Sequence, residues 1–264
     1  LLVFLIVSST QASEISLIGN FVQGGLIKGK AVGGVKIILN DQEISIADNG
    51  NFLLGFGHDA SPINTLEISF LNGSIIKKQI SIIQRKWITQ KINGLPNGMV
   101  NPADRDIERI NHERNMIYNV RQIDSDYKWA WDNFNWPLLG IVTGVYGSRR
   151  ILNGEIRQPH FGVDIAQDLG AEVVAPASGI VVLAEDNLYF TGGTIILDHG
   201  YGISSTFSHL SKLTVFLDSV VKKGEKIGEV GATGRATGPH LDWRVNWFNV
   251  RLDPALLVPI INVD

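Results

Sequence analysis

Three short apolar runs occupy residues 179–207, GIVVLAEDNLYFTGGTIILDHGYGISSTF, and they decide the predicted fold. The runs are Gly179–Ala184, Thr194–Leu197 and Ser204–Phe207, with glycine-containing turns at Gly192-Gly193 and Asp198-His199-Gly200 between them. Short runs of apolar and β-branched residues bounded by turn residues are typical of strands. Since no long helical pattern interrupts these runs, we expect an antiparallel β-domain.

Similar runs continue on both sides of this stretch. Just before residues 179–207 the predicted strand is Ala171–Ala175. After them the predicted strands are Leu213–Leu217, Lys226–Val230 and Leu241–Val245. Between Ile15 and Ile92 they are Val35–Leu39, Glu43–Ile46, Phe52–Phe56, Thr65–Leu71, Ser74–Ile83 and Trp87–Ile92. Asn72-Gly73 joins two of these runs and predicts a hairpin with a type I′ turn, because Asn and Gly tolerate a positive φ. The N-terminal region is therefore predicted to be a small Ig-like β-sandwich.

A linking segment separates the two β regions. Asn101 is the expected N-cap of a helix with Pro102 at its first position, and apolar residues recur at helical spacing after it. The aromatic run Trp129–Trp136 is interpreted either as a carbohydrate platform or as a packing surface against the next domain, and packing is favoured. We therefore divide the chain into a β-sandwich (residues 13–93), a linker with a helix (94–136) and a second β-domain (137–259).

Residues 1–12 are interpreted as a signal peptide whose start is missing. Leu1–Val7 is uninterrupted apolar sequence, and small and polar residues follow it up to Ala12. An N-terminal strand is the alternative. A membrane-spanning helix needs about 20 apolar residues, so we expect no transmembrane segment and an exported mature protein.

Composition excludes several classes of function. The 264 residues include 23 Lys and Arg against 26 Asp and Glu, for a net charge of −3, which gives no reason to expect nucleic acid as a partner. The absence of cysteine excludes disulfides, thiol nucleophiles and cysteine zinc sites. A metal site in this chain must use His, Asp and Glu.

Histidines and carboxylates recur at short spacings in the second β-domain. His160 and Asp164 are four residues apart, and His240 and Asp242 are two apart, so each pair shares one face of an extended chain. His209 follows the run that ends at Phe207. Imidazole and carboxylate ligands suit Zn²⁺, which keeps an open position in catalytic sites. Each pair alone is a weak signal.

The sequence around these residues resembles the motifs of the lysostaphin-like (LytM-type) zinc endopeptidases, which hydrolyse peptidoglycan. The motifs are Gly147-Ser148-Arg149, Pro159–Ala166 (PHFGVDIA), Ala175–Val181 (APASGIV), Ser208–Ser211 (SHLS) and Gly231–Leu241 (GATGRATGPHL). The resemblance extends from about Pro137 to Leu257. It implies a periplasmic or envelope-associated enzyme that cleaves peptide cross-links. The bonds to expect are glycyl bonds or D-alanyl–diaminopimelyl links, and the latter are favoured.

The resemblance also implies roles for individual residues. It assigns His160 and Asp164 as ligands of one Zn²⁺ per chain, and His209 and His240 as catalytic histidines. The third metal ligand of the family is a histidine, and here Asp242 stands in its place. Two carboxylates would neutralise the metal, so we expect weaker activation of water than in a relative with a histidine. Arg149 is a candidate for binding a substrate carboxylate, with a structural salt bridge as the alternative.

Two other classes of function compete with this one. A LytM-type protein that has lost activity can activate a cell-wall amidase or act as a regulatory partner, and Asp242 is one step toward such a protein. A lipoyl- or biotin-carrier module has similar glycine turns, but it needs a lysine on an exposed hairpin. Lys212 is the only lysine between Val181 and Val221, and no glycine flanks it. The hydrolase is the preferred prediction.

Overall fold

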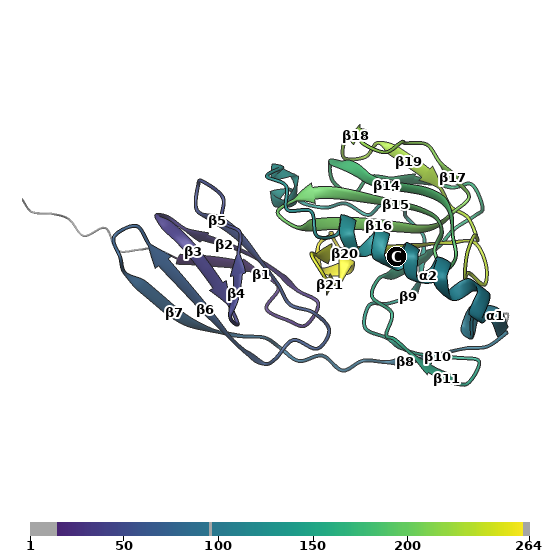
Figure 1. Cartoon of the computed structure of the whole chain (residues 1–264), viewed down its shortest axis with the longest axis horizontal. Helices are drawn as coiled ribbons and strands as arrows, with labels where there is room; N and C mark the ends of the chain where they lie inside the picture. Colours follow the sequence, from purple (N-terminus) through teal and green to yellow (C-terminus); the bar gives the residue numbers. More distant parts are fainter. Residues whose placement is uncertain (1–14, 95–96, 261–264) are drawn as a thin grey trace, which may run out of the picture.

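The computed structural model describes residues 15–94 and 97–260, so the predicted signal peptide lies outside the described residues. The N-terminal part contains two antiparallel sheets (Figure 1). The first has the order β1-β2-β5, formed by Ile15–Gly19, Leu26–Ala31 and Asn51–Gly55. The second has the order β4-β3-β6-β7, formed by Gln42–Ile44, Gly34–Leu39, Ile63–Phe70 and Ile75–Ser81. Alternate side chains of both sheets, such as Leu66 and Ile68 of β6, are buried in one core, as in a sandwich.

Three details of this part differ from the prediction. The predicted strands did not include β1 and β2, because Lys and Gly interrupt the apolar pattern of β2. The hairpin at Asn72-Gly73 is confirmed, since β6 pairs with β7. Its turn is not type I′, because only Gly73 of the two has a positive φ, and Phe70 and Ser74 close a three-residue loop. The run Trp87–Ile92 contains β8 (Thr89–Ile92), which pairs in parallel with a strand of the C-terminal part.

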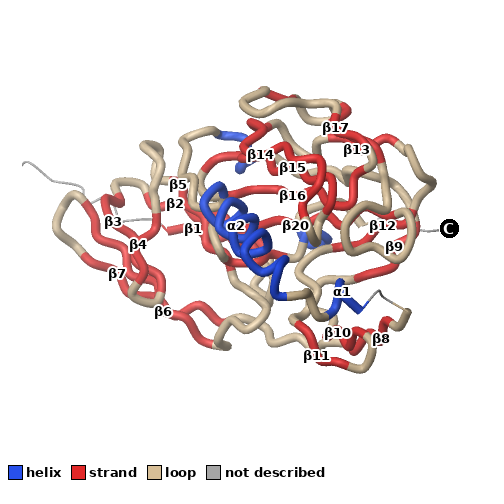
Figure 2. Tube along the Cα trace, turned by 45° about the vertical axis from the view of Figure 1, so that its right-hand side comes forward, coloured by secondary structure: helices blue, strands red, loops and turns tan. Residues whose placement is uncertain are grey.

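The linking segment contains the helices α1 (Asn97–Val100) and α2 (Asp104–Val120). The prediction placed the start of the helix at Pro102, and this is wrong by two residues. Asn101 does not cap the helix; its amide oxygen accepts a hydrogen bond from Arg157 at 2.6 Å. Met116, Ile117 and Val120 pack against side chains of the large C-terminal sheet, so α2 lies across that sheet (Figure 2).

Within the described residues, the large C-terminal sheet has eight strands, all paired antiparallel. Its order is β18-β14-β15-β16-β20-β12-β9, and β21 also pairs with β20. In that order the strands are Val220–Val221, Gly179–Leu188, Gly192–Gly200, Ile203–Leu210, His240–Trp247, Val163–Ala166 and Ile141–Gly144, and β21 is Val250–Leu252. The predicted antiparallel β-domain is confirmed.

Two small sheets flank the large one. One has the order β13-β19-β17, formed by Glu172–Val174, Lys226–Glu229 and Lys212–Leu213. The other has the order β11-β10-β8, formed by Glu155–Arg157, Arg149–Leu152 and the strand Thr89–Ile92. The short helices η1 (Lys128–Trp131) and η2 (Pro254–Leu256) complete the elements. No helix in the described part of the chain is both long and apolar enough to cross a bilayer.

The aromatic segment after α2 packs against the C-terminal sheet. Phe134 is buried, and Trp131 and Trp136 lie against the main core. The ring of Trp136 contacts that of Trp243 on β20, with centroids 5.9 Å apart. This geometry supports the packing interpretation over the carbohydrate platform.

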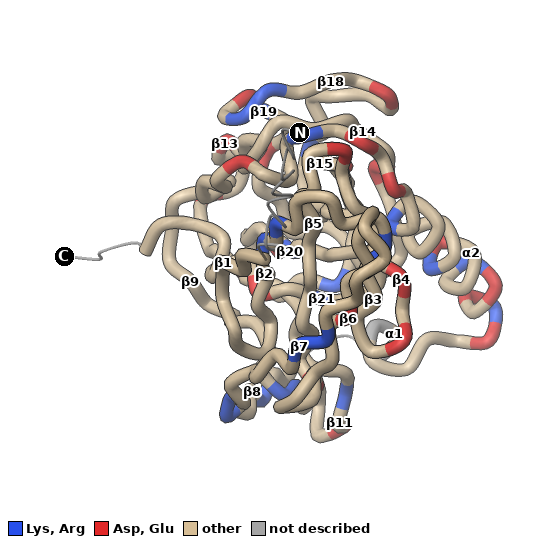
Figure 3. Tube along the Cα trace, turned by 90° about the vertical axis from the view of Figure 1, so that its left-hand side faces the viewer, with Lys and Arg blue, Asp and Glu red and all other residues tan. Residues whose placement is uncertain are grey.

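Strand β20 separates two chemical environments. Its apolar side chains are buried on the core side: Leu241, Trp243, Val245 and Trp247. Its polar side chains, which alternate with them, face the side covered by α2: His240, Asp242, Arg244 and Asn246. The neighbouring strand β16 adds Thr206 and Ser208 to the same face, opposite Arg244 and Asp242. Charged residues of both signs also occur along α2 (Figure 3).

Candidate metal centre

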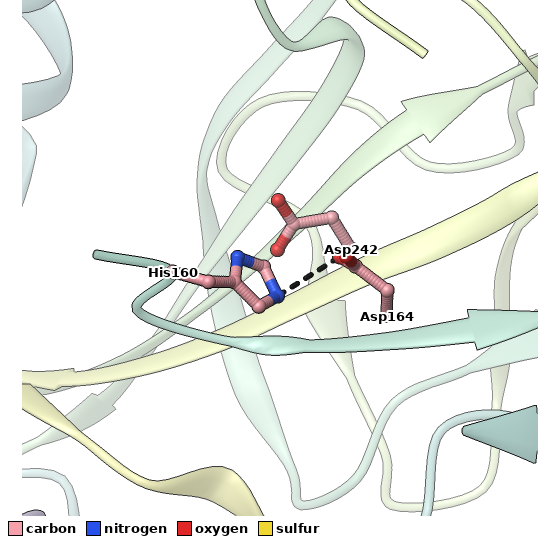
Figure 4. Close-up of side chains that lie close together, drawn as sticks. All are labelled: His160, Asp164 and Asp242. Carbon is pink, nitrogen blue, oxygen red and sulfur yellow. Dashed lines mark ion pairs between the residues drawn. The ribbon is translucent and has the colours of Figure 1, made fainter. Parts of the chain in front are cut away.

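Three candidate metal ligands from distant parts of the sequence meet on this face of the sheet (Figure 4). Asp164 on β12 lies directly opposite Asp242 on β20, because the two strands pair in antiparallel register. His160 precedes β12 and turns its ring toward both carboxylates. All three are buried, with exposed fractions of 2%, 8% and 2% for His160, Asp164 and Asp242. One ligand atom from each residue lies within 4.8 Å of the others.

The bonding state of these atoms fits a cation. His160 Nε2 lies 3.0 Å from Asp164 Oδ1, yet both atoms are buried without a hydrogen-bond partner within the described structure. A buried polar atom without a partner is costly, and two such atoms that converge indicate a missing shared partner. An imidazole nitrogen and carboxylate oxygens are ligands that Zn²⁺ accepts. The residues present therefore fit the predicted divalent metal.

Glycines make room for both carboxylates. A Cβ on Gly144, which pairs with Asp164, would lie 2.2 Å from Asp164 Oδ2. A Cβ on Gly162 would lie 2.8 Å from Asp242 Oδ1. A side chain at either position would force neighbouring atoms to shift, with a carboxylate oxygen among the atoms in its way, so the glycines help to shape the centre.

Two arginines hold the carboxylates in place. Arg150 on β10 donates to Asp164 Oδ2 at 2.7 Å, and Arg244 binds both oxygens of Asp242, with Nε 2.9 Å from Oδ1. Burial alone would raise the pKa of Asp242, but the charge and hydrogen bonds of Arg244 hold it well below its usual range. The expectation of weaker water activation set the charges of two carboxylate ligands against that of the metal. In the structure each carboxylate also has an arginine partner, so the surroundings of the centre are less negative than the ligands alone would make them, and the expectation stays a prediction.

His209 and His240 lie beside the three candidate ligands. Their ring centroids are 4.7 Å apart, and both residues line the same small cavity of about 60 Å³ as Asp164 and Asp242. His209 Nδ1 is 2.8 Å from Thr233 O, and His240 Nδ1 is 2.8 Å from Gly238 O. A carbonyl can only accept, so Nδ1 carries the proton in each ring and Nε2 is left as an acceptor.

His209 has two further unusual properties. Its φ is +67°, a left-handed conformation that is uncommon for a residue other than glycine and that often occurs at functional sites. Burial lowers the pKa of His209 to about 4, so its ring is neutral near pH 7. A neutral ring with a free Nε2 is able to accept a proton.

The remaining candidates lie elsewhere. Arg149 is exposed, and the arginine that reaches Asp164 is its neighbour Arg150, because consecutive residues of a strand face opposite sides. His199 lies within β15 rather than in a turn, and it is fully buried, with Nδ1 2.7 Å from Ser178 O and Nε2 2.9 Å from Ser205 Oγ. Both of its ring nitrogens are occupied, so it is not a candidate ligand.

Four residues around the centre were not predicted from the sequence: Arg150, Arg244, Gly144 and Gly162. A signal for Arg244 was present, since the spacing that pairs His240 with Asp242 continues to Arg244 on the same face. Arg150 and Gly144 reach Asp164 only through the pairing of β-strands, and no short spacing indicates this.

Comparison with known proteins agrees with this site. The model of Peptidase family M23 matches residues 158–254. The chain is similar to the crystal structure of a peptidase M23 from Pseudomonas aeruginosa, with a TM-score of 0.63, 28% identity, and coverage of 89% of this chain and 93% of that one.

Curated relatives are similar to part of the chain. Peptidoglycan DD-endopeptidase ShyB of Vibrio cholerae is 31% identical over 138 residues, which are 52% of this chain and 30% of the relative. A lipoprotein NlpD/LppB homolog of Pseudomonas aeruginosa is 35% identical over 106 residues, which are 40% of this chain and 32% of the relative. The chain thus spans about a third of each relative. Residues 158–254 form a domain of peptidase family M23.

Proposed function

We propose that the chain is a zinc metalloendopeptidase that hydrolyses peptide cross-links of bacterial peptidoglycan. The observation that carries this proposal is the convergence of His160 Nε2 and Asp164 Oδ1, both buried and without hydrogen bonds, beside Asp242. The name of the relative from Vibrio cholerae supports the substrate class. The same similarity supports export to the periplasm or cell envelope.

His160, Asp164 and Asp242 would hold the zinc ion. When bound, Zn²⁺ supplies Lewis-acid chemistry and acidifies water. The two histidines then act through their Nε2 atoms. Either ring accepts the proton of the attacking water, and a protonated ring next to the substrate stabilises the developing oxyanion. The backbone carbonyls of Thr233 and Gly238 orient the rings for both tasks.

Arg150 and Arg244 position the carboxylate ligands. Because each guanidinium binds one carboxylate, Asp164 and Asp242 stay ionised and oriented before a metal arrives. The two glycines beside the carboxylates allow this orientation. The chain therefore supplies a largely preorganised ligand set.

A second function is favoured by one observation. Arg244 satisfies both oxygens of Asp242 without any metal, which suits a protein whose centre has lost its cation. Such a chain would activate a cell-wall amidase by contact instead of hydrolysing a bond. The chain's similarity to the lipoprotein NlpD/LppB homolog is the reason to compare the two functions. The partnerless atoms of His160 and Asp164 favour the enzyme.

Elemental analysis of the purified chain tests the proposal first. We expect about one zinc per chain for the wild type, as in a site with three protein ligands, and none for His160→Ala. His112→Ala, an exposed histidine on α2, is the control and should keep its zinc.

Digestion of purified peptidoglycan, with the products identified by mass, is the second step. The wild type should release uncross-linked peptides, and His160→Ala should release none. Wild-type protein that takes up no zinc when zinc is supplied would contradict the enzyme. Stimulation of an amidase by that metal-free chain would establish the activator instead.

A further inference from the structure

A second cavity adjoins the metal centre on the face covered by α2. Its volume is about 440 Å³, within the range of cavities that bind small molecules. His209 and Asp242 line both this cavity and the smaller one at the centre. The charged residues of its lining are Arg114, Arg121, Arg150, Arg235, Arg244, Arg251, Glu113 and Asp242. We call this cavity, with its six arginines and two carboxylates, the arginine pocket.

The acidic side chains do not balance these arginines. Glu113 pairs with Arg109 outside the pocket at 2.7 Å, and Asp242 pairs with Arg244. Among the residues that the structure describes, Arg121 and Arg251 have no carboxylate within 4.0 Å. The pocket therefore carries excess positive charge at its inner end.

Arg121 is the most unusual of these residues. It is only 7% exposed, and the one hydrogen bond of its side chain within the described residues runs from Nη2 to Thr206 Oγ1 at 3.1 Å. Its Nε is buried without a partner in the described structure. The same is true of Oγ of Ser208, which lies two residues after Thr206 on β16 and also lines the pocket. Burial and the charges of Arg251 and Arg244 lower the pKa of Arg121 well below its usual range. Arginine is almost never fully buried without a partner, because its desolvation is costly.

The fold holds Arg121 in this position. It is the C-cap of α2, and the last turns of α2 are fixed by the packing of Ile117 and Val120 on Leu183 and Ile196 of the sheet. The backbone of Arg121 is therefore fixed at the end of the helix. Its guanidinium is held in the pocket by burial and by the hydrogen bond to Thr206.

The pocket also has an apolar wall, which narrows the choice of ligand. Ile110, Ile117 and Tyr118 of α2 form one wall, and Phe190 lies opposite in the loop after β14. An inorganic anion would use the arginines and leave this wall in water. A carboxylate on a peptide would use both, since a planar carboxylate matches the guanidinium fork and an apolar body covers the wall.

We propose that the arginine pocket binds the carboxylate of a peptide next to the metal centre. Arg121 and Arg251 bind the carboxylate oxygens, and Ser208 donates its hydroxyl. The apolar wall holds the aliphatic part of the peptide. This binding depends on the pocket alone and stands whether or not the centre hydrolyses a bond.

Isothermal titration of the full chain with N-acetyl-D-alanyl-D-alanine tests the proposal, with the C-terminal amide of the same peptide and inorganic phosphate as comparison ligands. We expect the acid to bind at least about tenfold more tightly than the amide, because one buried charge-assisted contact contributes more than 1.4 kcal/mol. Phosphate should bind more weakly than the acid. Equal binding of acid and amide, tighter binding of phosphate, or no binding of the acid would overturn the proposal.

Variants locate the binding. Arg121→Gln and Arg251→Gln should each weaken binding of the acid at least about tenfold. Arg105→Gln is the control, because this arginine of α2 has a side chain that is 87% exposed and lies outside the pocket. If Arg121→Gln does not fold, Arg251→Gln carries the test. An unchanged affinity in the folded variants would overturn the assignment.

Thermal unfolding without ligand gives a readout that a structural role would not produce. Arg121→Met removes a buried charge that lacks a carboxylate, so the melting temperature should stay the same or rise. A clear fall in melting temperature would show that Arg121 supports the fold, and would overturn its role as a ligand-binding residue.

Discussion

The metal centre and the arginine pocket share one face of the same sheet, but they differ in which kinds of atom lack a hydrogen-bond partner. At the centre, both carboxylates have an arginine partner, and the described ligand atoms that are buried without a hydrogen bond are the two ring nitrogens of His160 and Oδ1 of Asp164. In the pocket, the described side-chain atoms buried without a partner are the Nε atoms of Arg121 and Arg150 and the hydroxyl of Ser208. The first arrangement suits a cation and the second suits an anion. Neighbouring sites can thus be distinguished by which atoms are left unsatisfied.

Arg244 belongs to both sites. It binds Asp242 at the centre, and it also lines the pocket, where its charge adds to that of Arg121. A substrate that spans the two sites would place an anionic group in the pocket and its scissile bond near His209. Because Arg244 already forms an ion pair with Asp242, an anion in the pocket would have to bind to the other arginines.

The largest expected effect comes from removing the partner of Arg244. Asp242→Ala would leave a mostly buried guanidinium without its carboxylate and make the centre resemble the pocket. Breaking a buried ion pair from one side costs about 3–5 kcal/mol of unfolding free energy. Urea unfolding in the presence of a chelator measures this, so that loss of metal does not contribute.

The double variant Asp242→Ala with Arg244→Leu is the matched comparison. It removes the pair as a unit, and most of the lost stability should return. Glu67→Ala, which breaks a pair with the mostly exposed Lys77, should cost less than about 1 kcal/mol. A double variant as unstable as the single one would show that the ion pair is not the cause.

The next effect concerns the protonation of the buried His199 at low pH. Burial lowers the pKa of His199 to about 4, against about 6.5 in the unfolded chain. Between these values the unfolded state binds the extra proton, so stability is full above pH 6.5 and falls as the pH drops toward 4. The contribution of His199 between about pH 7.5 and about pH 5 is about 2 kcal/mol.

Urea unfolding of wild type and His199→Gln at these two pH values checks this contribution. The variant should lose less stability on acidification than the wild type, by about 2 kcal/mol. His112→Gln, which changes an exposed histidine, should follow the wild type. His209, whose pKa is also about 4, is present in all three proteins, so its contribution to the loss of stability in acid is the same in each. Parallel curves for wild type and His199→Gln would count against a neutral buried His199.

The sequence predicts the positions of the centre better than its chemistry. His160, Asp164, His209, His240 and Asp242 were expected together from their motifs, and the structure brings them together. The resemblance of the motifs carries that information, because the short spacings alone are weak signals. The expectation of weaker water activation did not take account of Arg244, whose charge lies beside Asp242 on the same face of the strand.

The pocket was not predicted at all, for a physical reason. Arg121 ends a helix, and Thr206 lies on a strand 85 residues away, so only the docking of α2 on the sheet brings them together. The same limit applies to β8, whose pattern resembles the N-terminal strands although it pairs with β10. Strand periodicity indicates which face a residue occupies and does not indicate which strand lies beside it.

The smallest effect we predict would change the centre without changing any of its charges. Gly144→Ala adds one methyl group that would overlap Asp164 Oδ2, so the carboxylate must leave its present position. Displacing a residue that orients a ligand lowers metal affinity by about 10–100-fold. Competition for zinc with a chromophoric chelator measures the change. Gly98→Ala is the control, because a Cβ at that glycine meets open space. Unchanged zinc affinity in Gly144→Ala would mean that Asp164 does not need its present orientation, and the charge balance at the centre would then be more important than its geometry.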